Sequence, residues 1–262
     1  MNTDDYDKRF GGIQRLYGTE AQAVLKEMHI FVAGVGGVGS WVVEALARTG
    51  IGKISFIDGD TVDVSNANRQ LHTLTSSFDQ TKVEVMAERV RQISPDCEIN
   101  AIYEYINMAN MFGYLDQGYD YVIDALDSIK FKSNMIAYCK RNKIPVIATG
   151  GAGGLNDPTM IQVADLSKTF NDPLAAKVRS RLRSEFNFSR NAKRSFGVEC
   201  VFSSQQQVYP KPDGSVSHEK PGIHGVSLDC RFGYGSASFV TGTFGFIAAS
   251  RAINKALKKH LA

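Results

Sequence analysis

A glycine-rich turn, Gly34-Val35-Gly36-Gly37-Val38-Gly39, constrains the fold of this chain more than any other feature of its sequence. It follows an apolar run at residues 29–33 and precedes an amphipathic stretch that contains Trp41 and Leu46. Glycines in a GxGxxG turn permit the sharp bend and a close approach to phosphate, and the following helix presents free amide groups to an anion. The context predicts a nucleotide-binding turn between a strand and a helix, but the turn alone does not distinguish NAD from ATP.

The first half of the chain alternates apolar runs with amphipathic stretches, which is typical of strand-helix-strand units around a parallel sheet. We expect an α/β fold with a Rossmann-like, mostly parallel sheet and helices on both faces. The predicted strands are residues 29–34, 53–58, 98–103, 121–124 and 145–149. The predicted helices are residues 38–48, 82–93 and 128–141, where apolar side chains recur at helical spacing.

The second half is less regular. The glycine run at 150–154 predicts a flexible turn, followed by a strand at 160–165 and a charged helix at 173–186. Prolines and glycines in residues 205–229 predict a long mobile loop over the site. The apolar stretch 239–249 is shorter than the ~20 residues of a membrane span, and we expect a buried helix there.

Composition limits where the chain acts. The formal net charge is only +3, so an acidic partner such as nucleic acid is permitted but not required. The four cysteines are far apart without any CxxC pair, which indicates reduced thiols in a cytoplasmic protein: Cys97, Cys139, Cys200 and Cys230. The acidic first residues do not resemble an export signal. Lysines at 255, 258 and 259 leave peripheral association with a membrane open.

Charged residues after the second strand favour ATP over NAD. Asp58 lies 19 residues beyond Gly39, where a carboxylate accepts hydrogen bonds from ribose hydroxyls in either nucleotide. Arg69 can present a planar fork to phosphate oxygens, and Lys82 a compact positive charge. Two cations near one phosphate-binding turn suit a triphosphate rather than a neutral nicotinamide.

Two further acidic residues lie in Asp124-Ala125-Leu126-Asp127, at the end of the fourth predicted strand. Ligands of open α/β sheets bind at this carboxyl edge, and Mg²⁺ commonly takes one or two carboxylates together with phosphate oxygens. We therefore expect Asp127 to hold Mg²⁺ and Asp124 to cap or orient the loop. An aspartate before Ser128 also fits a helix N-cap, and that alternative stays open.

These residues together resemble the adenylation domain of the E1-like, or ubiquitin-activating, superfamily over about residues 10–165. The features that carry the resemblance are the glycine turn, Asp58, Asp60, Ser65-Asn66-Ala67-Asn68-Arg69-Gln70, Lys82 and residues 124–127. Within that superfamily the chain is similar nearly end to end to the tRNA threonylcarbamoyladenosine dehydratase family. The matching stretches are Arg9-Phe10-Gly11-Gly12, Arg15-Leu16-Tyr17-Gly18, Gly37-Val38-Gly39-Ser40-Trp41, Asp172-Pro173-Leu174-Ala175-Ala176-Lys177 and Val201-Phe202-Ser203-Ser204.

The resemblance implies a single domain over residues 1–262, with an adenylation core at 1–165 and a substrate-side extension at 166–262 that continues the sheet. It implies that ATP and Mg²⁺ are used to adenylate the threonyl carboxylate of N6-threonylcarbamoyladenosine in tRNA, which then closes to its cyclic form. It also implies a homodimer and leaves room for a sulfur-relay partner.

The roles of individual residues follow from the same resemblance. Arg69, Lys82 and Mg²⁺ at Asp127 would stabilise charge at the α-phosphate, and Arg9 or Arg15 would reach the nucleotide of the partner subunit. The implied nucleotide-binding residues are Gly34, Gly36, Gly37, Gly39, Asp58, Asp60, Asn66, Asn68, Arg69, Gln70, Lys82, Leu126 and Asp127.

The densest basic stretch of the chain predicts the contact with tRNA. It has seven cations against the single acid Glu185: Lys177, Arg179, Arg181, Arg183, Arg190, Lys193 and Arg194. Binding to a phosphate backbone is one use of such a stretch, and a solvated helix face is the other. The aromatic side chains beside it, at 186, 188 and 196, suit either stacking on an unpaired base or burial in the core.

Three other functions fit the sequence less well. Adenylation of a ubiquitin-like sulfur carrier usually comes with two CxxC zinc pairs, which this chain lacks, and neither Cys200 nor Cys230 stands out as a thioester-forming thiol. A regulatory protein with a degenerate site fits poorly with intact Arg69, Lys82 and Asp127, and a nicotinamide-dependent oxidoreductase fits less well still. The histidines show no metal-ligand spacing; His72 is expected to pack near the nucleotide loop, and His224 could meet substrate.

Overall fold

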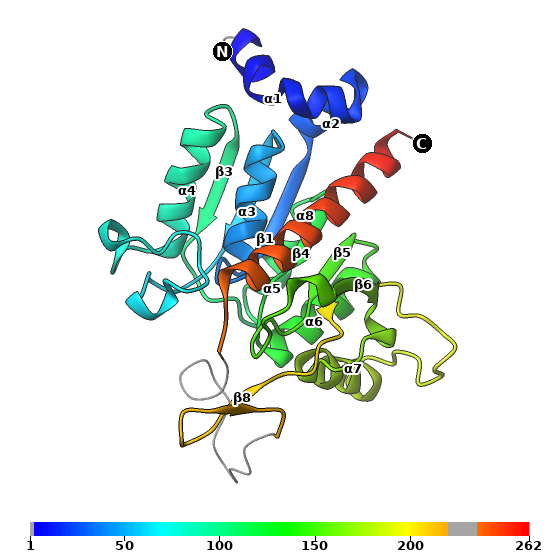
Figure 1. The fold of residues 1–262 in the computed structure, drawn as a ribbon. Helices are drawn as coiled ribbons and strands as arrows, with labels where there is room; N and C mark the ends of the chain where they lie inside the picture. The colour runs from blue at the N-terminus through cyan, green and yellow to red at the C-terminus, as the bar shows by residue number, and fades with distance from the viewer. Residues whose placement is uncertain (1–2, 220–234, 262) are drawn as a thin grey trace.

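The computed structural model describes residues 3–219 and 235–261 (Figure 1). One sheet of seven strands has the order β3-β2-β1-β4-β5-β7-β6, in which neighbours are parallel except for β6 and β7. The strands are β1 (His29–Ala33), β2 (Lys53–Ile57), β3 (Glu98–Ile102), β4 (Tyr121–Asp124), β5 (Val146–Thr149), β6 (Ile161–Asp165) and β7 (Glu199–Ser203). The predicted Rossmann-like sheet is confirmed, and β7 extends it from the second half of the chain by pairing in parallel with β5.

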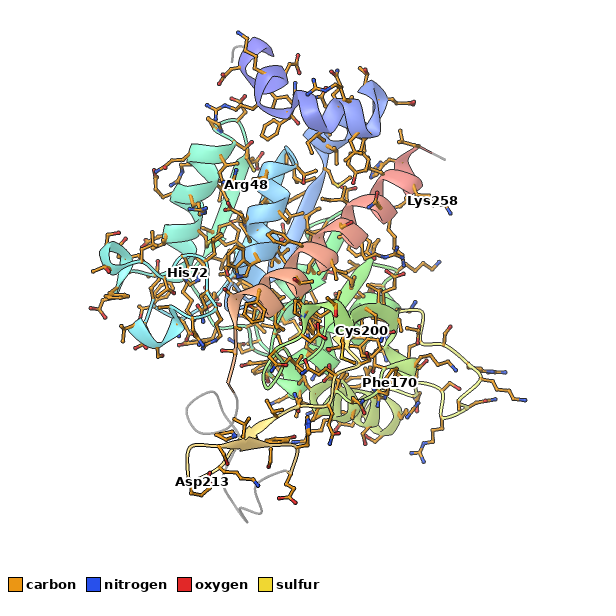
Figure 2. The ribbon with its side chains drawn as sticks, in the orientation of Figure 1. Arg48, His72, Phe170, Cys200, Asp213 and Lys258 are labelled. Carbon is orange, nitrogen blue, oxygen red and sulfur yellow. The ribbon has the colours of Figure 1, made fainter. Side chains whose placement is uncertain are left out.

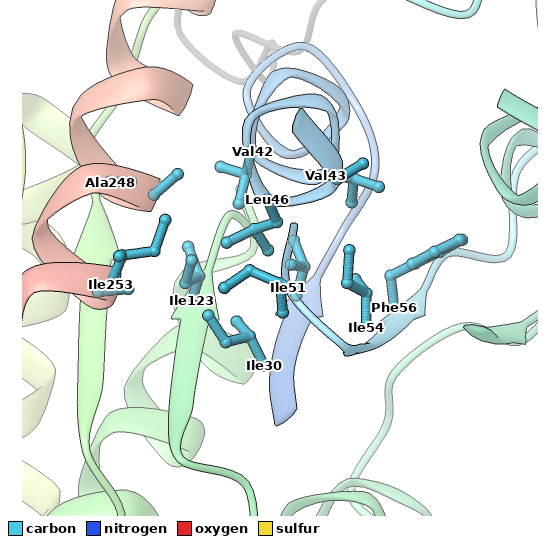
Figure 3. Packing of buried hydrophobic residues seen from close by; sticks show 14 of the residues in the cluster. Ile30, Val42, Val43, Leu46, Ile51, Ile54, Phe56, Ile123, Ala248 and Ile253 are labelled. Atoms are coloured by element: carbon cyan, nitrogen blue, oxygen red, sulfur yellow. The ribbon is translucent and has the colours of Figure 1, made fainter. Parts of the chain in front are cut away.

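Helices cover both faces of the sheet, as predicted. One face carries α2 (Thr19–Glu27), α3 (Gly39–Arg48), α4 (Lys82–Ile93) and α8 (Ser238–His260); the other carries α5 (Met111–Leu115), α6 (Ile129–Arg141) and α7 (Pro173–Glu185). Successive side chains of β1 point to opposite faces of the sheet and so contribute to a hydrophobic cluster on each face. Ile30 and Val32 belong to the first cluster, under α3 and α8, and Phe31 and Ala33 belong to the second, under α6 and α7. Figure 3 shows the first cluster, with Ile253 of α8 packed over the strands.

Helix α8 is longer than the predicted segment 239–249 because its apolar stripe continues to Leu257. It packs closely on α3: a Cβ added to Gly245 would lie 2.7 Å from Trp41 Cβ. In the part of the chain that the structure describes, no helix combines the length and the apolar character that crossing a membrane requires.

Two elements at the amino edge of the sheet were not predicted as helices, α1 (Thr3–Tyr17) and α2. Helix α1 is fixed by Tyr6, whose hydroxyl donates to the carbonyl oxygen of Gly50 at 2.7 Å, and Phe10 packs beside it with ring centroids 4.7 Å apart. In Figure 1 these helices lie beyond the start of β1, at the end opposite to the glycine turn.

The glycine run at 150–154 is an anchored turn, which corrects the prediction of a flexible one. The amide of Gly151 donates to Asp172 Oδ2 at 3.0 Å, and the amide of Val208 donates to the Gly154 carbonyl at 2.9 Å. A side chain at Gly150 would collide with Asp172, because a Cβ there would lie 1.8 Å from its carboxylate. The β5 end is therefore tied to the N-terminus of α7.

The predicted loop at 205–229 is only partly described. Residues 209–217 form a small antiparallel hairpin of β8 (Tyr209–Pro210) and β9 (Val216–Ser217). Residues 220–229, with His224, and the following Cys230 lie outside the described residues. Short 3₁₀ helices complete the chain at Val64–Asn66, Thr75–Ser77, Pro158–Met160 and Leu166–Lys168.

Candidate functional site

The glycine turn lies where β1, β2 and β4 end together. Gly34 has φ +87°, a backbone conformation that glycine adopts without steric cost. A Cβ at Gly39 would lie 1.8 Å from the Gly34 carbonyl oxygen, so the helix can approach the strand only with glycine there. A Cβ at Gly34 would meet the Ala125 carbonyl oxygen at 3.2 Å and Leu126 Cδ2 at 3.5 Å. The loop after β4 is thus packed directly on the turn, and the predicted Leu126 lies at the site.

Helix α3 begins immediately after the turn without a side-chain cap, since its N-cap residue is Val38. Among the described residues no hydrogen bond uses the amides of Gly36 or Gly37. Unpaired amides at a helix N-terminus, together with the positive end of the helix dipole, attract an anion. The turn therefore leaves two amides open to an anion.

Asp58 ties the turn to the end of β2. Its Oδ2 accepts the Val35 amide at 2.8 Å, and its Oδ1 accepts the Asp60 amide at 2.9 Å. Desolvation raises the pKa of Asp58, although the nearby charge of Lys82 and these two hydrogen bonds oppose the rise. Each carboxylate oxygen accepts one bond here and keeps a second lone pair, so the predicted contact with a ribose remains open to it.

Lys82 and Asp60 form an ion pair at the first turn of α4. Lys82 Nζ lies 2.7 Å from Asp60 Oδ2, and the lysine side chain is only 6% exposed while that of Asp60 is 50% exposed. Burial acts to raise the pKa of Asp60, but hydrogen bonds from Lys82 and the Tyr105 hydroxyl hold it below its usual value. The predicted cation is in place next to the turn, with Asp60 as its partner.

Arg69 lies against the turn. Its Cδ and Cγ are 3.5 Å from the position a Cβ would take on Gly37. Its carbonyl oxygen accepts from Trp41 Nε1 at 3.0 Å and from Thr241 Oγ1 at 3.1 Å, so α3 and α8 both hold the loop that carries it. The guanidinium donates through Nη1 to the Ser65 carbonyl at 3.0 Å and has no carboxylate partner among the described residues.

The neighbours of Arg69 divide into two kinds. Gln70 approaches the turn, with Nε2 3.9 Å from the Cβ position of Gly36. Asn66 is 8% exposed and closes a capping box with Asp63, and Asn68 donates to the Ser236 carbonyl at 2.9 Å. In the structure both asparagines therefore bond to the protein's own loops, and their predicted contacts with the nucleotide stay predictions.

The loop after β4 is fixed by a buried ion pair. Asp124 is fully buried, and its Oδ2 lies 3.0 Å from Nζ of Lys132, which is 2% exposed. Asp124 Oδ1 accepts the Leu126 amide at 3.1 Å, so Asp124 orients the loop as expected. Desolvation raises the pKa of Asp124 and Lys132 opposes this. Sequence reasoning missed Lys132, because a lysine in an amphipathic helix usually faces solvent.

Asp127 is exposed, and no hydrogen bond or ion pair joins it to another described residue. The N-cap of α6 is Ser128, so Asp127 does not serve as the cap that the sequence left open. Its carboxylate is available at the same edge as the glycine turn.

The two N-terminal arginines are not at this edge. Arg9 bonds to Asp5 Oδ2 at 3.1 Å and to the Ile93 carbonyl at 3.3 Å, where α4 ends. Because α4 begins at Lys82 and rises roughly 1.5 Å per residue, Arg9 is separated from the turn by the length of that helix. Arg15 is exposed on α1 without a hydrogen bond or ion pair in the described structure. One chain alone brings neither arginine to its own glycine turn.

The basic segment separates into half-buried and exposed cations. Arg179 bonds to Thr169 Oγ1, Arg181 lies 2.8 Å from Glu185, and Arg183 donates to the Ser189 carbonyl at 3.3 Å while its guanidinium lies over the Phe196 ring. The other four cations are exposed: Lys177, Arg190, Lys193 and Arg194. Figure 2 shows the stretch after α7 projecting from the body of the molecule.

The aromatic and thiol groups near this segment belong to the core. Phe188 packs edge-to-face on Phe196 at 4.9 Å, and Phe186 lies against the same apolar cluster. Cys97, Cys139 and Cys200 are buried free thiols, and burial raises the pKa of Cys200 well above its usual range. No described cysteine has the exposure or the lowered pKa of a nucleophile.

The chain is similar to known proteins over nearly its whole length. The chain matches the ThiF family over residues 9–261. It is 53% identical over 256 residues to a tRNA threonylcarbamoyladenosine dehydratase of Haemophilus influenzae, covering 98% of this chain and 96% of that protein. A crystal structure of E. coli tRNA N6-threonylcarbamoyladenosine dehydratase in complex with ATP superposes with a TM-score of 0.88 at 48% identity, covering 100% of this chain and 98% of that one. The complex of that enzyme with AMP gives a TM-score of 0.89 at 48% identity, with coverage of 100% and 99%.

Proposed function

This chain belongs to the ThiF family, and from that premise we propose that it is an ATP-dependent dehydratase that acts on N6-threonylcarbamoyladenosine in tRNA. The observation that carries the proposal is the convergence of the glycine turn, Arg69, Lys82 and Asp127 at one edge of the sheet. A triphosphate needs an anion site with cations beside it, and this edge supplies both.

The reaction couples loss of water to cleavage of ATP. A carboxylate oxygen of the threonyl group attacks the α-phosphorus, the bond to the bridging oxygen breaks, and pyrophosphate leaves. An atom of the carbamoyl group then attacks the acyl carbon, closes the ring and expels AMP, which carries away the carboxylate oxygen. The water lost from the nucleoside is thus divided between that oxygen in AMP and protons released to solvent.

Arg69 and Lys82 stabilise the charge that develops at the α-phosphate. Arg69 lies against Gly37, and Lys82 is connected to Val35 through Asp60 and Asp58. Lys82 is buried, so its charge acts where solvent screening is weak. The pair with Asp60 positions the lysine before the nucleotide arrives.

Asp127 is the residue that would hold Mg²⁺. Its carboxylate is exposed and unpaired among the described residues, which contain no cluster of three or more metal-ligating side chains. A single protein carboxylate suits Mg²⁺, which proteins usually hold through one or two carboxylates together with phosphate oxygens. The ion would neutralise phosphate charge during attack at the α-phosphorus.

The exposed cations of the basic segment are the proposed contact with the tRNA backbone. Lys177 is exposed on α7, and Arg190, Lys193 and Arg194 are exposed on the stretch that follows the helix. Arg179, Arg181 and Arg183 hold the helix through their own protein partners.

Free thiols at three described cysteines agree with a reducing compartment, and we place the enzyme in the cytoplasm. A sulfur-relay partner stays a prediction.

The first test compares tRNA that carries threonylcarbamoyladenosine with the same tRNA lacking it. We expect release of AMP and pyrophosphate only with the modified tRNA, and a loss of one water from the nucleoside by mass spectrometry. Substrate labelled with ¹⁸O in the threonyl carboxylate should transfer one label to AMP. The proposal would be contradicted if ATP cleavage required a ubiquitin-like protein instead of the modified tRNA, or if the released AMP carried no label.

The second test concerns a homodimer in which Arg15 completes the partner's site. Arg15 is favoured over Arg9 because Arg9 is already bonded to Asp5 and to the end of α4. Neither Asp127→Ala nor Arg15→Ala should be active alone. A mixture should regain activity, because the chain with an intact Asp127 receives an intact arginine from its partner. No recovery in mixed dimers, shown to form by light scattering or tag exchange, would contradict it.

A further inference from the structure

Val35 is the residue of the glycine turn whose two backbone polar groups are both held by side chains. Its amide donates to Asp58 Oδ2 at 2.8 Å, and its carbonyl oxygen lies 2.8 Å from Nε2 of His72. Val35 is fully buried and His72 is 1% exposed. Glycines flank Val35 on both sides, and their backbone is free to rotate in ways other residues avoid. The two side chains therefore fix peptide groups that the local sequence leaves free.

His72 is a neutral donor of one defined tautomer. A carbonyl oxygen only accepts, so Nε2 must carry the proton, while Nδ1 is buried without a partner among the described residues. Burial lowers the pKa of His72 to about 4; the bond to Val35 opposes this and the charge of Lys82 adds to it. Ser77 Oγ donates to the His72 carbonyl at 2.6 Å and holds its backbone.

The peptide joining Val35 to Gly36 is trans, as are the others in the described chain. In a trans peptide the carbonyl and the next amide point in opposite directions. Because the Val35 carbonyl points to His72, the Gly36 N–H points away from it. That amide has no acceptor among the described residues and belongs to the anion site in front of α3.

We propose that His72 is a positioning residue of the nucleotide site. Its hydrogen bond to the Val35 carbonyl fixes the peptide that follows, so that the Gly36 amide points toward a phosphate group of ATP. This inference rests on the proposed use of ATP and gives a role to a side chain that was expected only to pack. His72 touches neither the nucleotide nor the reacting atoms. It acts through one peptide plane.

Two amide variants of different reach test the proposal. Glutamine places its Nε2 donor near the position of the imidazole Nε2, whereas asparagine has the same chemistry on a side chain one methylene shorter. His72→Asn should weaken ATP binding about tenfold, the loss of one oriented hydrogen bond, and His72→Gln should stay within about twofold of the unchanged protein. Calorimetric titration with ATP and Mg²⁺ in the absence of tRNA measures both. In turnover, the KM for ATP should rise in His72→Asn with little change in kcat.

A purely structural role would give a different pattern. It would lower the melting temperature of both variants without separating their ATP affinities, and that result overturns the inference, as does wild-type affinity in His72→Asn. His72→Leu, which keeps the side-chain volume, repeats the test if the asparagine variant does not fold. An unchanged protein that binds ATP but does not dehydrate the modified tRNA would overturn the proposed function and leave this test intact.

Discussion

The carboxyl edge of the sheet and the basic segment at 177–194 were both predicted from charged residues, but the fold treats them differently. At the sheet edge, Arg69 comes to the glycine turn from a loop, and Lys82 lies beside the turn at the start of α4. In the basic segment, Arg181 and Arg183 turn to Glu185 and to the Ser189 carbonyl. Parallel strands place their carboxyl ends side by side, so a motif at one strand end predicts its neighbours. A count of charges carries no such geometry.

In both regions, the residues proposed for function differ from the residues that stabilise the fold. At the sheet edge the group proposed for chemistry, Asp127, is exposed and unbonded in the described structure, and the group beneath it, Asp124, is buried and paired with Lys132. In the basic segment the three half-buried arginines have protein partners, and the other four cations face solvent. Variants can therefore remove one role without the other.

The largest effect is expected from Asp127→Ala. Loss of the proposed Mg²⁺ ligand should lower turnover by about a thousandfold, while unfolding free energy should change by less than about 0.5 kcal/mol because the side chain has no described partner. Turnover with modified tRNA and urea denaturation measure the two. Asp96→Ala, an exposed aspartate in the turn between α4 and β3, is the matched control and should change neither. Normal turnover in Asp127→Ala would remove the assignment.

Lys132→Met should have the next largest effect, on stability. Removing the lysine leaves the Asp124 carboxylate buried without a counter-charge, at a cost of about 3 kcal/mol in unfolding free energy. Adding Asp124→Asn should recover most of that loss, because the buried charge is then gone. Lys130→Met, at an exposed lysine on the same helix, should be neutral. If Lys132→Met is as stable as the unchanged protein, the ion pair does not hold the loop.

Most of the fold could be predicted because its strands and helices have clear periodicity. Helix α4 agrees with the prediction at both ends, and most strands agree within a residue. Helices α1 and α2 were missed because α1 is stabilised by a distant contact, Tyr6 on Gly50, and not by a strong apolar stripe of its own. Helix α5 has five residues, too few to show a helical period.

The site was predictable where a residue's role follows from the motif and not where it depends on packing. Gly39 and Leu126 lie where the motif requires them. Lys132 was missed, and His72 was expected only to pack, because a lysine or histidine acquires a buried partner only when another segment covers it. Asn66 and Asn68 show the reverse, since the resemblance assigns them to the nucleotide and the structure gives them partners in the protein.

A smaller effect is expected in the basic segment. Reversing both charges in Lys193→Glu with Arg194→Glu should weaken tRNA binding about tenfold at physiological salt and lower the slope of log affinity against log salt by about two, with ATP binding unchanged. The matched control is Lys258→Glu with Lys259→Glu at the end of α8, an adjacent exposed pair with the same change in charge (Figure 2). Equal losses in both pairs would mean that overall charge, and not this segment, attracts tRNA.

Arg181→Glu with Arg183→Glu removes two half-buried cations of the same segment. We expect weaker tRNA binding here to come with a loss of about 1 kcal/mol in unfolding free energy, because both arginines have protein partners. Filter binding and urea denaturation on the same samples separate the two effects. A full loss of tRNA affinity at unchanged stability would show that these two arginines, and not the exposed pair, contact the backbone.

The smallest effect is expected from Cys200→Ala on β7, the strand that connects the basic segment to the sheet. Closure of an adenylate by the carbamoyl group needs no thiol, so turnover should stay within about twofold, while loss of buried sulfur should cost about 1 kcal/mol and about 3 °C in Tm. Cys139→Ala, equally buried on α6, should behave in the same way. Loss of turnover in Cys200→Ala alone, with the fold retained, would place a thiol in the chemistry and move the reaction toward a thioester mechanism.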